Sequence, residues 1–226
     1  MDRGLTGRTT MSDTVDAVVF DMNGVLIDSM PMHTGLSRRL LEEAGMELTE
    51  EEMLRYMGRG AEDFFHIVKE EKGGDFDPDE LSERKLREFV DRVAEIPVMT
   101  GAADAIRSLS ETYRVGIASN DQRRSVETVL ERLDVTDHVD GIATIEAVET
   151  GKPDPAIYRV VTDRLDVAPA ATVAVEDSPV GVQAARAAGL RAIGFRSSPG
   201  VALGDATATV EDMDTLLAQV PRLDGA

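Results

Sequence analysis

Short apolar runs alternate with amphipathic stretches along most of the chain, and this alternation predicts how the chain folds. Runs of four or five mostly apolar residues, rich in Val and Ile, are too short for helices and predict buried strands. They lie at Ala17–Phe20, Arg114–Ala118, Gly141–Thr144, Thr172–Val175 and Ala192–Phe195. Between them, the pattern predicts helices at Ala102–Ser110, Arg124–Leu133, Pro155–Arg164 and Val180–Ala188. Strands that alternate with helices in this way predict an α/β fold with a parallel sheet.

The segment from about Met32 to Ile96 interrupts this alternation. It is highly charged and has no convincing strand, but its pattern predicts several helices, at Gly35–Ala44, Glu50–Tyr56, Ala61–Glu71 and Asp79–Glu95. We therefore expect a helical cap over residues 31–97, inserted into a core made of residues 13–30 and 98–226. A second Met stands at position 11, so we expect residues 1–12 to form a disordered leader, unless the start site has been assigned too early.

Charge and composition narrow the classes of function. The 226 residues include 43 Asp and Glu against 24 Lys and Arg, which gives a formal net charge of -19. Such a surface repels nucleic acid and anionic lipid, so we expect neither as a partner. The absence of Cys excludes thiolate chemistry, and no run of about 18 apolar residues could span a membrane. The acid-rich, Lys-poor composition predicts a halophilic, cytoplasmic protein, because high salt screens the repulsion between acidic groups.

The first predicted strand ends in VVFDMNGVLIDS, which places a carboxylate beside a Gly-containing turn. A carboxylate at the tip of a buried strand can present an oxygen while nearby backbone N–H groups face an incoming anion. Asp21 is therefore a candidate nucleophile that could form an aspartyl-phosphate, and Met22 is a candidate phosphate contact. For this stretch alone, an Asp that only caps the turn is an equally good explanation.

A second pair of carboxylates follows another predicted strand. The stretch VAVEDSPVGVQAARAAG places Glu176 and Asp177 at that strand's end. Ligands on open α/β sheets bind at the carboxyl ends of the strands, so these side chains can meet Asp21 there. Mg²⁺ prefers hard oxygen ligands, and Asp21, Asp177 and a backbone carbonyl would suit it.

Two further stretches offer groups that bind phosphate. The stretch YRVGIASND ends in Ser119 and Asn120, whose side chains can hydrogen-bond a phosphoryl oxygen. The loop GKPDPAIY supplies Lys152, the only Lys in the second half of an Arg-rich chain. An ammonium group can neutralise phosphate charge, which makes a specific role for Lys152 more plausible than a solvated surface position.

Four motifs together resemble a known family. FDMNGVLIDS, ASN, GKPDP and VEDSPVGVQAARAAG, in this order within about residues 14–200, resemble the haloacid dehalogenase superfamily. The resemblance is strongest to its phosphatase and β-phosphoglucomutase branch with a helical cap, and it implies a Rossmann-like core. It also implies Asp21 as the nucleophile, Ser119 and Lys152 as catalytic phosphate contacts, and Asp177, assisted by Glu176, as the Mg²⁺ ligand.

Asn23 departs from the pattern of this family. In its phosphatases the residue two positions after the nucleophile is an Asp, which protonates the leaving oxygen and then activates the water. The carbonyl of Asn23 can still bind Mg²⁺ and its amide can still donate a hydrogen bond, so it stays among the candidate metal ligands and catalytic residues. Proton transfer is lost, and that is typically worth about 10²–10⁴-fold in rate.

Several explanations of Asn23 remain open. It could be an engineered Asp→Asn change that slows the reaction, or a natural variant with weak or altered activity. A dehalogenase is a third reading, although those enzymes resemble FDxYGT and need no metal. A fourth reading is a protein that has lost catalysis and only binds its ligand. The presence of all the other motif residues argues against this reading. Gly24 follows Asn23, a context prone to deamidation, so trace activity could also come from an Asp formed in storage.

The predicted cap carries three candidate substrate contacts. His33 lies twelve residues after Asp21, where the sugar-phosphate mutases of the superfamily carry a His, and Lys85 aligns roughly with a Lys of those mutases. Arg59 lies two positions before the site at which they use an Arg on the second phosphate, and Ala61 occupies that site here. This shift favours a phosphatase over a mutase that handles bisphosphates.

The sequence as a whole predicts an Mg²⁺-dependent phosphatase that is slowed by Asn23. A cap that closes over the site favours small phosphorylated metabolites, sugar phosphates first. A β-phosphoglucomutase-like phosphotransferase and a weakened binding protein are the alternatives. The sequence indicates no oligomeric state.

Overall fold

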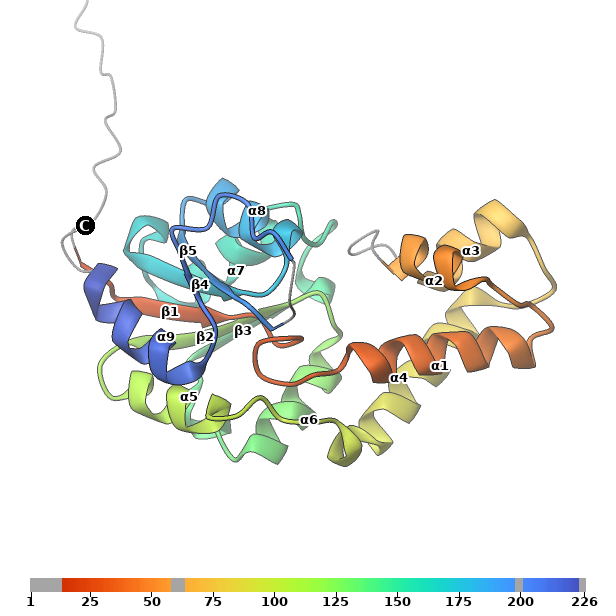
Figure 1. The fold of residues 1–226 in the computed structure, drawn as a ribbon, viewed down its shortest axis with the longest axis horizontal. Coiled ribbons are helices and arrows are strands. Elements are labelled where there is room, and N and C mark those ends of the chain that lie inside the picture. The colour runs from red at the N-terminus through yellow and green to blue at the C-terminus, as the bar shows by residue number, and fades with distance from the viewer. Residues whose placement is uncertain (1–13, 58–63, 198–200, 224–226) are drawn as a thin grey trace, which may run out of the picture.

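A six-stranded parallel sheet forms the centre of the computed structural model, which describes residues 14–57, 64–197 and 201–223 (Figure 1). The strand order is β3-β2-β1-β4-β5-β6, and every neighbouring pair is parallel. The strands are β1 (Ala17–Phe20), β2 (Arg114–Ser119), β3 (Gly141–Thr144), β4 (Thr172–Glu176), β5 (Arg191–Phe195) and β6 (Ala208–Val210). The predicted α/β fold with a Rossmann-like parallel sheet is confirmed.

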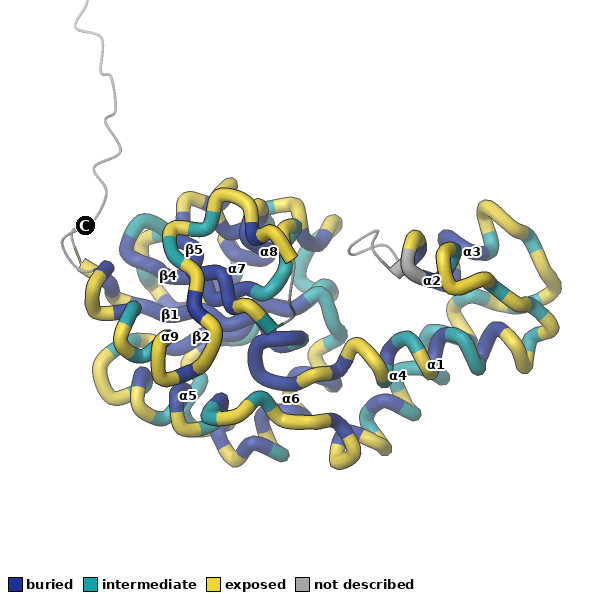
Figure 2. Tube along the Cα trace, viewed as in Figure 1, coloured by how far each residue is buried: buried dark blue, intermediate teal, exposed yellow. Residues whose placement is uncertain are grey.

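Helices cover both faces of the sheet. They are α5 (Ala102–Ser110), α6 (Arg123–Leu133), α7 (Ala156–Leu165), α8 (Pro179–Ala187) and α9 (Met213–Gln219). Successive side chains of a strand point to opposite faces. Accordingly, Val18 and Phe20 belong to the same buried cluster as residues of α5, α6 and α9, whereas Ala17 and Val19 belong to a cluster with residues of α7 and α8. Figure 2 shows the strands as the most continuously buried part of the chain.

Four helices lie beyond the carboxyl end of β1 (Figure 1). They are α1 (Met30–Glu43), α2 (Glu50–Met57), α3 (Phe64–Lys72) and α4 (Pro78–Asp91), and we call them the cap helices. They bury a separate apolar cluster of their own, which includes Leu40, Tyr56, Phe65 and Leu81. The exact domain boundaries stay a prediction, and the predicted disordered leader lies outside the described residues.

Short 3₁₀ helices join several of these elements. They are η1 (Val93–Glu95), η2 (Thr136–His138), η3 (Ile145–Ala147), η4 (Pro169–Ala171) and η5 (Val220–Leu223). Within the described residues, no helix combines the length and the apolar character that a membrane crossing requires.

The structure differs from the sequence-based expectation at a few element ends. Helix α1 begins at Met30 rather than Gly35, because Pro31 is tolerated in a first helical turn. Helix α4 ends at Asp91 and a 3₁₀ turn follows, which is a common way for a helix to end. Strand β6 and helix α9 were not predicted, since β6 has only three residues and lies at the sheet edge.

Candidate active site

Three parallel strands bring the predicted site residues to one edge of the sheet. Phe20 of β1 is in register with Ile117 of β2 and with Val175 of β4. The residues that follow these positions therefore emerge side by side. Asp21 follows β1. Ser119 ends β2 and Asn120 follows it, while Glu176 ends β4 and Asp177 follows it.

Asp21, Lys152, Glu176 and Asp177 form what we call the inner cluster. Each of its three carboxylates offers one oxygen, and these three oxygens lie within 4.8 Å of one another. Lys152 Nζ lies 2.6 Å from Asp21 Oδ1 and 2.5 Å from Glu176 Oε1, and it also donates to the carbonyl of Ala118 at 2.8 Å. Asp21, Lys152 and Glu176 are all buried. A single ammonium group thus faces three carboxylates in a site largely removed from water.

The loops that carry this cluster are shaped around its carboxylates. Gly24 has φ +73°, and a Cβ atom there would lie 1.8 Å from Asp177 Oδ2. A Cβ atom at Gly181, at the start of α8, would lie 2.0 Å from Glu176. Any side chain at either position would push a carboxylate out of place. Asn120 Oδ1 accepts the backbone N–H of Lys152 at 3.0 Å and so holds the lysine loop against β2.

Burial dominates the electrostatics of the inner cluster. It raises the pKa of the Asp21 carboxyl well above its ordinary value, against the opposing effect of Lys152. Burial and then the charge of Glu176 raise the pKa of Asp177 to about 6. Burial alone would lower the pKa of Lys152, but Asp21 and Glu176 outweigh it and hold this pKa above its usual range. The cluster therefore keeps its lysine charged, whereas burial opposes the ionisation of Asp21 and Asp177.

Tyr158 supports Glu176 from helix α7. Its hydroxyl donates to Glu176 Oε1 at 2.5 Å, and burial raises the pKa of Tyr158 well above its ordinary value, so it remains a neutral donor. Glu176 is fully buried and its Oε1 already receives both Tyr158 and Lys152. Asp177 is more exposed and accepts from Ser197 Oγ at 3.1 Å. Asp21 and Asp177 are thus the carboxylates best placed to contact a ligand, with Glu176 behind them.

Asn23, Ser29, His33 and Asp121 form a second group beside the first, which we call the outer cluster. Asn23 Nδ2 donates to Asp121 Oδ2 at 2.5 Å, and Asn23 Oδ1 accepts the hydroxyl of Ser29. His33 of α1 lies with its Nε2 3.8 Å from Asp121 Oδ1 and stacks on Phe89 of α4 at 4.6 Å between ring centroids. Burial and, more weakly, the charge of Lys85 lower the pKa of His33 to about 4, although Asp121 opposes this. Both ends of the Asn23 amide are therefore engaged.

The remaining predicted contacts have mixed outcomes. The side chain of Met22 is buried in the core, so only its backbone could meet a phosphate. Ser119 is buried, and its hydroxyl accepts the backbone N–H of Asp121 at 3.2 Å. The charge of Lys85 reaches His33. Arg59 and Ala61 lie outside the described residues.

Sequence reasoning missed Asp121, Tyr158, Ser29 and Ser197. Asp121 directly follows the ASN motif and Tyr158 ends the stretch GKPDPAIY, so both lay next to recognised residues. Their partners are 98 and 18 residues away along the chain, and no local pattern reveals such contacts.

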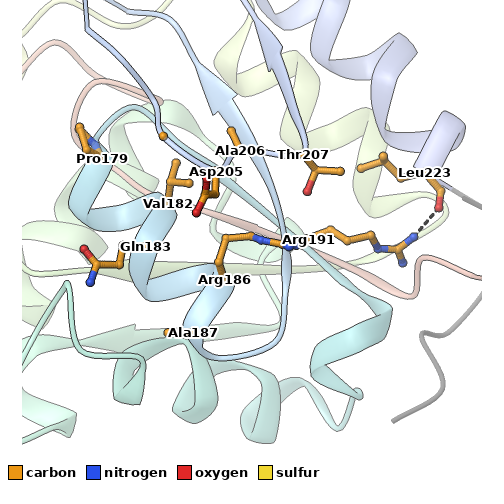
Figure 3. A pocket seen from close by; sticks show the side chains of 11 residues that line it. Pro179, Val182, Gln183, Arg186, Ala187, Arg191, Asp205, Ala206, Thr207 and Leu223 are labelled. Carbon is orange, nitrogen blue, oxygen red and sulfur yellow. Dashed lines mark hydrogen bonds between the residues drawn. The ribbon is translucent and has the colours of Figure 1, made fainter. Parts of the chain in front are cut away.

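A groove of about 1210 Å³ lies elsewhere on the core (Figure 3). Its lining comes from α8, from the start of β5, from the loop before β6 and from Leu223, and none of it belongs to either cluster. Arg191 is buried there, and its guanidinium donates to the carbonyls of Leu223 and Thr14. Arg191 therefore has a structural role, because it links the two ends of the described chain. Among the described residues that line it, the groove offers no cluster of reactive side chains like the one at the strand ends, so we place the candidate active site at the strand ends.

Several known proteins are similar to this chain. A family model described as haloacid dehalogenase-like hydrolase matches residues 15–189. A phosphorylated carbohydrates phosphatase of Thermotoga maritima is 33% identical over 79% of this chain and 84% of its own length. A β-phosphoglucomutase of Bacillus subtilis is 27% identical over 79% of this chain and 82% of its own. The crystal structure of CbbY from Rhodobacter sphaeroides in complex with phosphate has a TM-score of 0.81 and 25% identity, covering 90% of this chain and 96% of that one.

Proposed function

Because this chain belongs to the haloacid dehalogenase-like hydrolases, we propose that it is an Mg²⁺-dependent phosphatase acting on a small phosphorylated metabolite. The observation that carries the proposal is the inner cluster, in which Asp21 lies against Lys152 and near two further carboxylates. The phosphorylated carbohydrates phosphatase among its relatives favours a sugar phosphate as substrate. The acidic composition further suggests that the protein works in high salt, inside the cell.

The donor set of the inner cluster fits Mg²⁺. Three carboxylates offer hard oxygen atoms within 4.8 Å of one another. Burial first, and then neighbouring carboxylates, raise the pKa values of Asp21 and Asp177, and a bound cation would favour their ionised forms. We propose Asp21, Asp177 and the backbone carbonyl of Asn23 as direct ligands, with Glu176 behind them. When bound, the metal supplies positive charge that lets a phosphate dianion approach the carboxylates.

The residues of the chain then account for both halves of the reaction. Asp21 attacks the phosphorus, the bond to the alcohol oxygen breaks, and that oxygen takes up a proton as the alcohol leaves. Water next cleaves the aspartyl-phosphate, which releases inorganic phosphate and restores Asp21. Lys152 neutralises phosphate charge, and Ser119 and Asn120 provide hydrogen bonds from β2.

Asn23 sets the expected speed of this reaction. It cannot give the leaving oxygen a proton, so the proton comes from water. The loss of general acid and base catalysis predicts turnover about 10²–10⁴-fold below that of an enzyme with a carboxylic acid in that role. The two hydrogen bonds of its amide suggest that the surroundings are adapted to Asn, because an ionised Asp could not donate to Asp121.

Phosphatase assays on a panel of phosphate esters test this proposal. The chain would be assayed with Mg²⁺ in molar KCl, and mass spectrometry would exclude deamidation at Asn23. We expect slow phosphate release that Asp21→Asn abolishes, and a mass increase of one phosphoryl group on the peptide that contains Asp21. Phosphate release that survives Asp21→Asn would contradict the proposed nucleophile.

Metal binding can be tested without any turnover. Titration calorimetry should show Mg²⁺ binding to the intact chain and much weaker binding to Asp177→Asn. A matched control is Asp137→Asn, which removes the same charge from an exposed position at η2, before the amino end of β3. Equal affinities in all three proteins would show that the inner cluster does not hold the metal.

One observation favours a second candidate, a phosphotransferase that moves a phosphoryl group within a sugar phosphate. This is the similarity to the β-phosphoglucomutase of Bacillus subtilis. Phosphorus NMR of a reaction with β-glucose 1-phosphate separates the two functions. A phosphatase yields inorganic phosphate, whereas a mutase yields glucose 6-phosphate.

A further inference from the structure

Asp121 is a charged residue at the candidate active site to which the reaction above gives no role. It follows the ASN motif at the end of β2, and its backbone N–H donates to Ser119. Its side chain is 20% exposed, in contrast to the buried Asp21 and Glu176. Its Oδ2 accepts the Asn23 amide at 2.5 Å, so one carboxylate oxygen is held in place.

The other oxygen of Asp121 has no hydrogen-bond donor among the described residues. His33 Nε2 faces it at 3.8 Å, which is too long for a hydrogen bond. The His33 side chain is only 9% exposed, and its Nε2 atom is buried without a hydrogen-bond partner in the described part of the chain. Buried polar atoms normally have hydrogen-bond partners. Because the described residues provide none for these two facing atoms, the partner would come from a bound ligand.

A hydroxyl group satisfies both atoms at once. It can donate to Asp121 Oδ1 and accept from Nε2 when that nitrogen carries the ring proton. A phosphate or carboxylate oxygen can only accept, and it would meet the negative charge of Asp121. Because Nε2 is shielded from solvent, the partly exposed carboxylate of Asp121 is the more accessible of the two to an incoming group.

The position of Asp121 links it to the alcohol part of a substrate. Under the proposed function, the residue two positions after the nucleophile faces the leaving oxygen. Asp121 is hydrogen-bonded to that residue, Asn23, so its carboxylate lies next to the group that departs with the leaving oxygen. His33 adds no positive charge near neutral pH, because its pKa is about 4.

We infer that Asp121 selects phosphate esters whose alcohol part is neutral and hydroxylated, and that it rejects esters with a second anionic group nearby. This inference rests on the proposed function and narrows its substrate class to monophosphates of polyols and sugars. Bisphosphates and phosphorylated carboxylic acids are poor substrates because a second anion meets Asp121 at short range.

Paired substrates that differ in one group test this inference. Each pair has a hydroxymethyl group in one member and a carboxylate in the other: 2-hydroxyethyl phosphate with 2-phosphoglycolate, glycerol 3-phosphate with 3-phosphoglycerate, and sorbitol 6-phosphate with 6-phosphogluconate. For each pair we would measure the ratio of the two kcat/KM values. A ratio taken on one preparation cancels general losses of folding or activity.

The intact chain should prefer the hydroxymethyl member of at least one pair by about tenfold or more, since like charges in contact are strongly unfavourable. Asp121→Asn keeps the shape of the side chain, and it should lower that preference at least about fivefold by improving use of the acidic member. His33→Phe retains an aromatic ring against Phe89. It should lower kcat/KM for the hydroxymethyl member without raising kcat/KM for the acidic member. The control Asp137→Asn should leave the ratio unchanged.

The outcomes separate the inference from the function on which it rests. If esters are hydrolysed but the ratio is the same in Asp121→Asn and the intact chain, the inference is wrong and the phosphatase stands. If the intact chain prefers the acidic members, the inference is also wrong. If no ester is hydrolysed by any of these proteins, the proposed function fails and the inference fails with it.

Discussion

The inner and outer clusters lie at the same edge of the sheet but differ in almost every physical respect. The inner cluster is buried except at Asp177, carries three carboxylates against one lysine, and belongs wholly to the core. In the outer cluster, the side-chain amide of Asn23 makes both hydrogen bonds, and Asp121 provides the single carboxylate. It also brings the core and the cap helices together, since His33 of α1 faces Asp121, which follows β2, at 3.8 Å.

This difference suggests a division of labour. Groups that must stabilise a developing charge work best in a dry, preorganised site, and only the inner cluster provides one. Groups that discriminate between substrates must meet the variable part of the ligand, and the outer cluster lies where the cap helices approach the core. Perturbing the inner cluster should therefore cost stability and chemistry together, whereas perturbing the outer cluster should change rate and selectivity.

Removing Lys152 should have the largest effect. Lys152→Met leaves three neighbouring carboxylates without their internal counter-charge, so we expect a loss of about 3–5 kcal/mol in the free energy of unfolding and no detectable turnover. Denaturant titration in high KCl measures the stability. The matched control is Lys72→Met on α3, which removes an exposed ion pair with Glu52 and should cost about 1 kcal/mol or less. Similar losses in both variants would remove the distinction between buried and exposed charge on which the comparison rests.

The pH dependence of stability should report the inner cluster next. Asp177 has a pKa of about 6 against an ordinary value of 3.8, so the folded protein binds more protons than the unfolded chain between those values. Stability of the metal-free protein should therefore fall as the pH rises through this window, by roughly 1–3 kcal/mol relative to Asp177→Asn. Saturating Mg²⁺ should reduce the fall, because metal binding favours the ionised carboxylate. Identical pH profiles for the two proteins would mean that Asp177 titrates normally.

Exchanging the amide and the acid of the outer cluster should have an intermediate effect. Asn23→Asp restores a proton donor but sets a carboxylate directly against Asp121, and it removes the amide donor. The double variant Asn23→Asp with Asp121→Asn keeps the hydrogen bond and avoids the repulsion. We expect the double variant to turn over at least about fivefold faster than Asn23→Asp and to melt at a higher temperature. A single variant as active and as stable as the double one would show that the two residues are not coupled.

Removing the hydroxyl of Ser29 should have the smallest effect. Ser29→Ala takes one donor from Asn23 Oδ1, while the bond to Asp121 remains. We expect a loss of about 1 kcal/mol in unfolding free energy and a change in turnover below about threefold. The exposed helical hydroxyl of Thr128 is the control, and Thr128→Ala should change stability by about 0.5 kcal/mol or less. A large loss of activity in Ser29→Ala would place Ser29 in the chemistry itself.

Much of the core could be predicted because its signals are local. The strands β1 and β3 have the predicted bounds, since a buried parallel strand is an unbroken apolar run with little else to confuse it. Asp21, Ser119, Glu176 and Asp177 could be found because each ends such a run. Strand β6 could not, because three small residues at a sheet edge carry no such pattern.

The family of the protein and its inner cluster follow from the sequence alone, because their residues lie in ordered motifs attached to recognisable strands. The sequence also showed that Asn23 stands where an acid is expected, but not what the amide does. Only the tertiary structure decided that Asn23 holds Asp121 and that Tyr158 supports Glu176. Such contacts join side chains on different elements, so they depend on how those elements pack against one another. Packing is a property of the whole fold, and no single stretch of the chain encodes it.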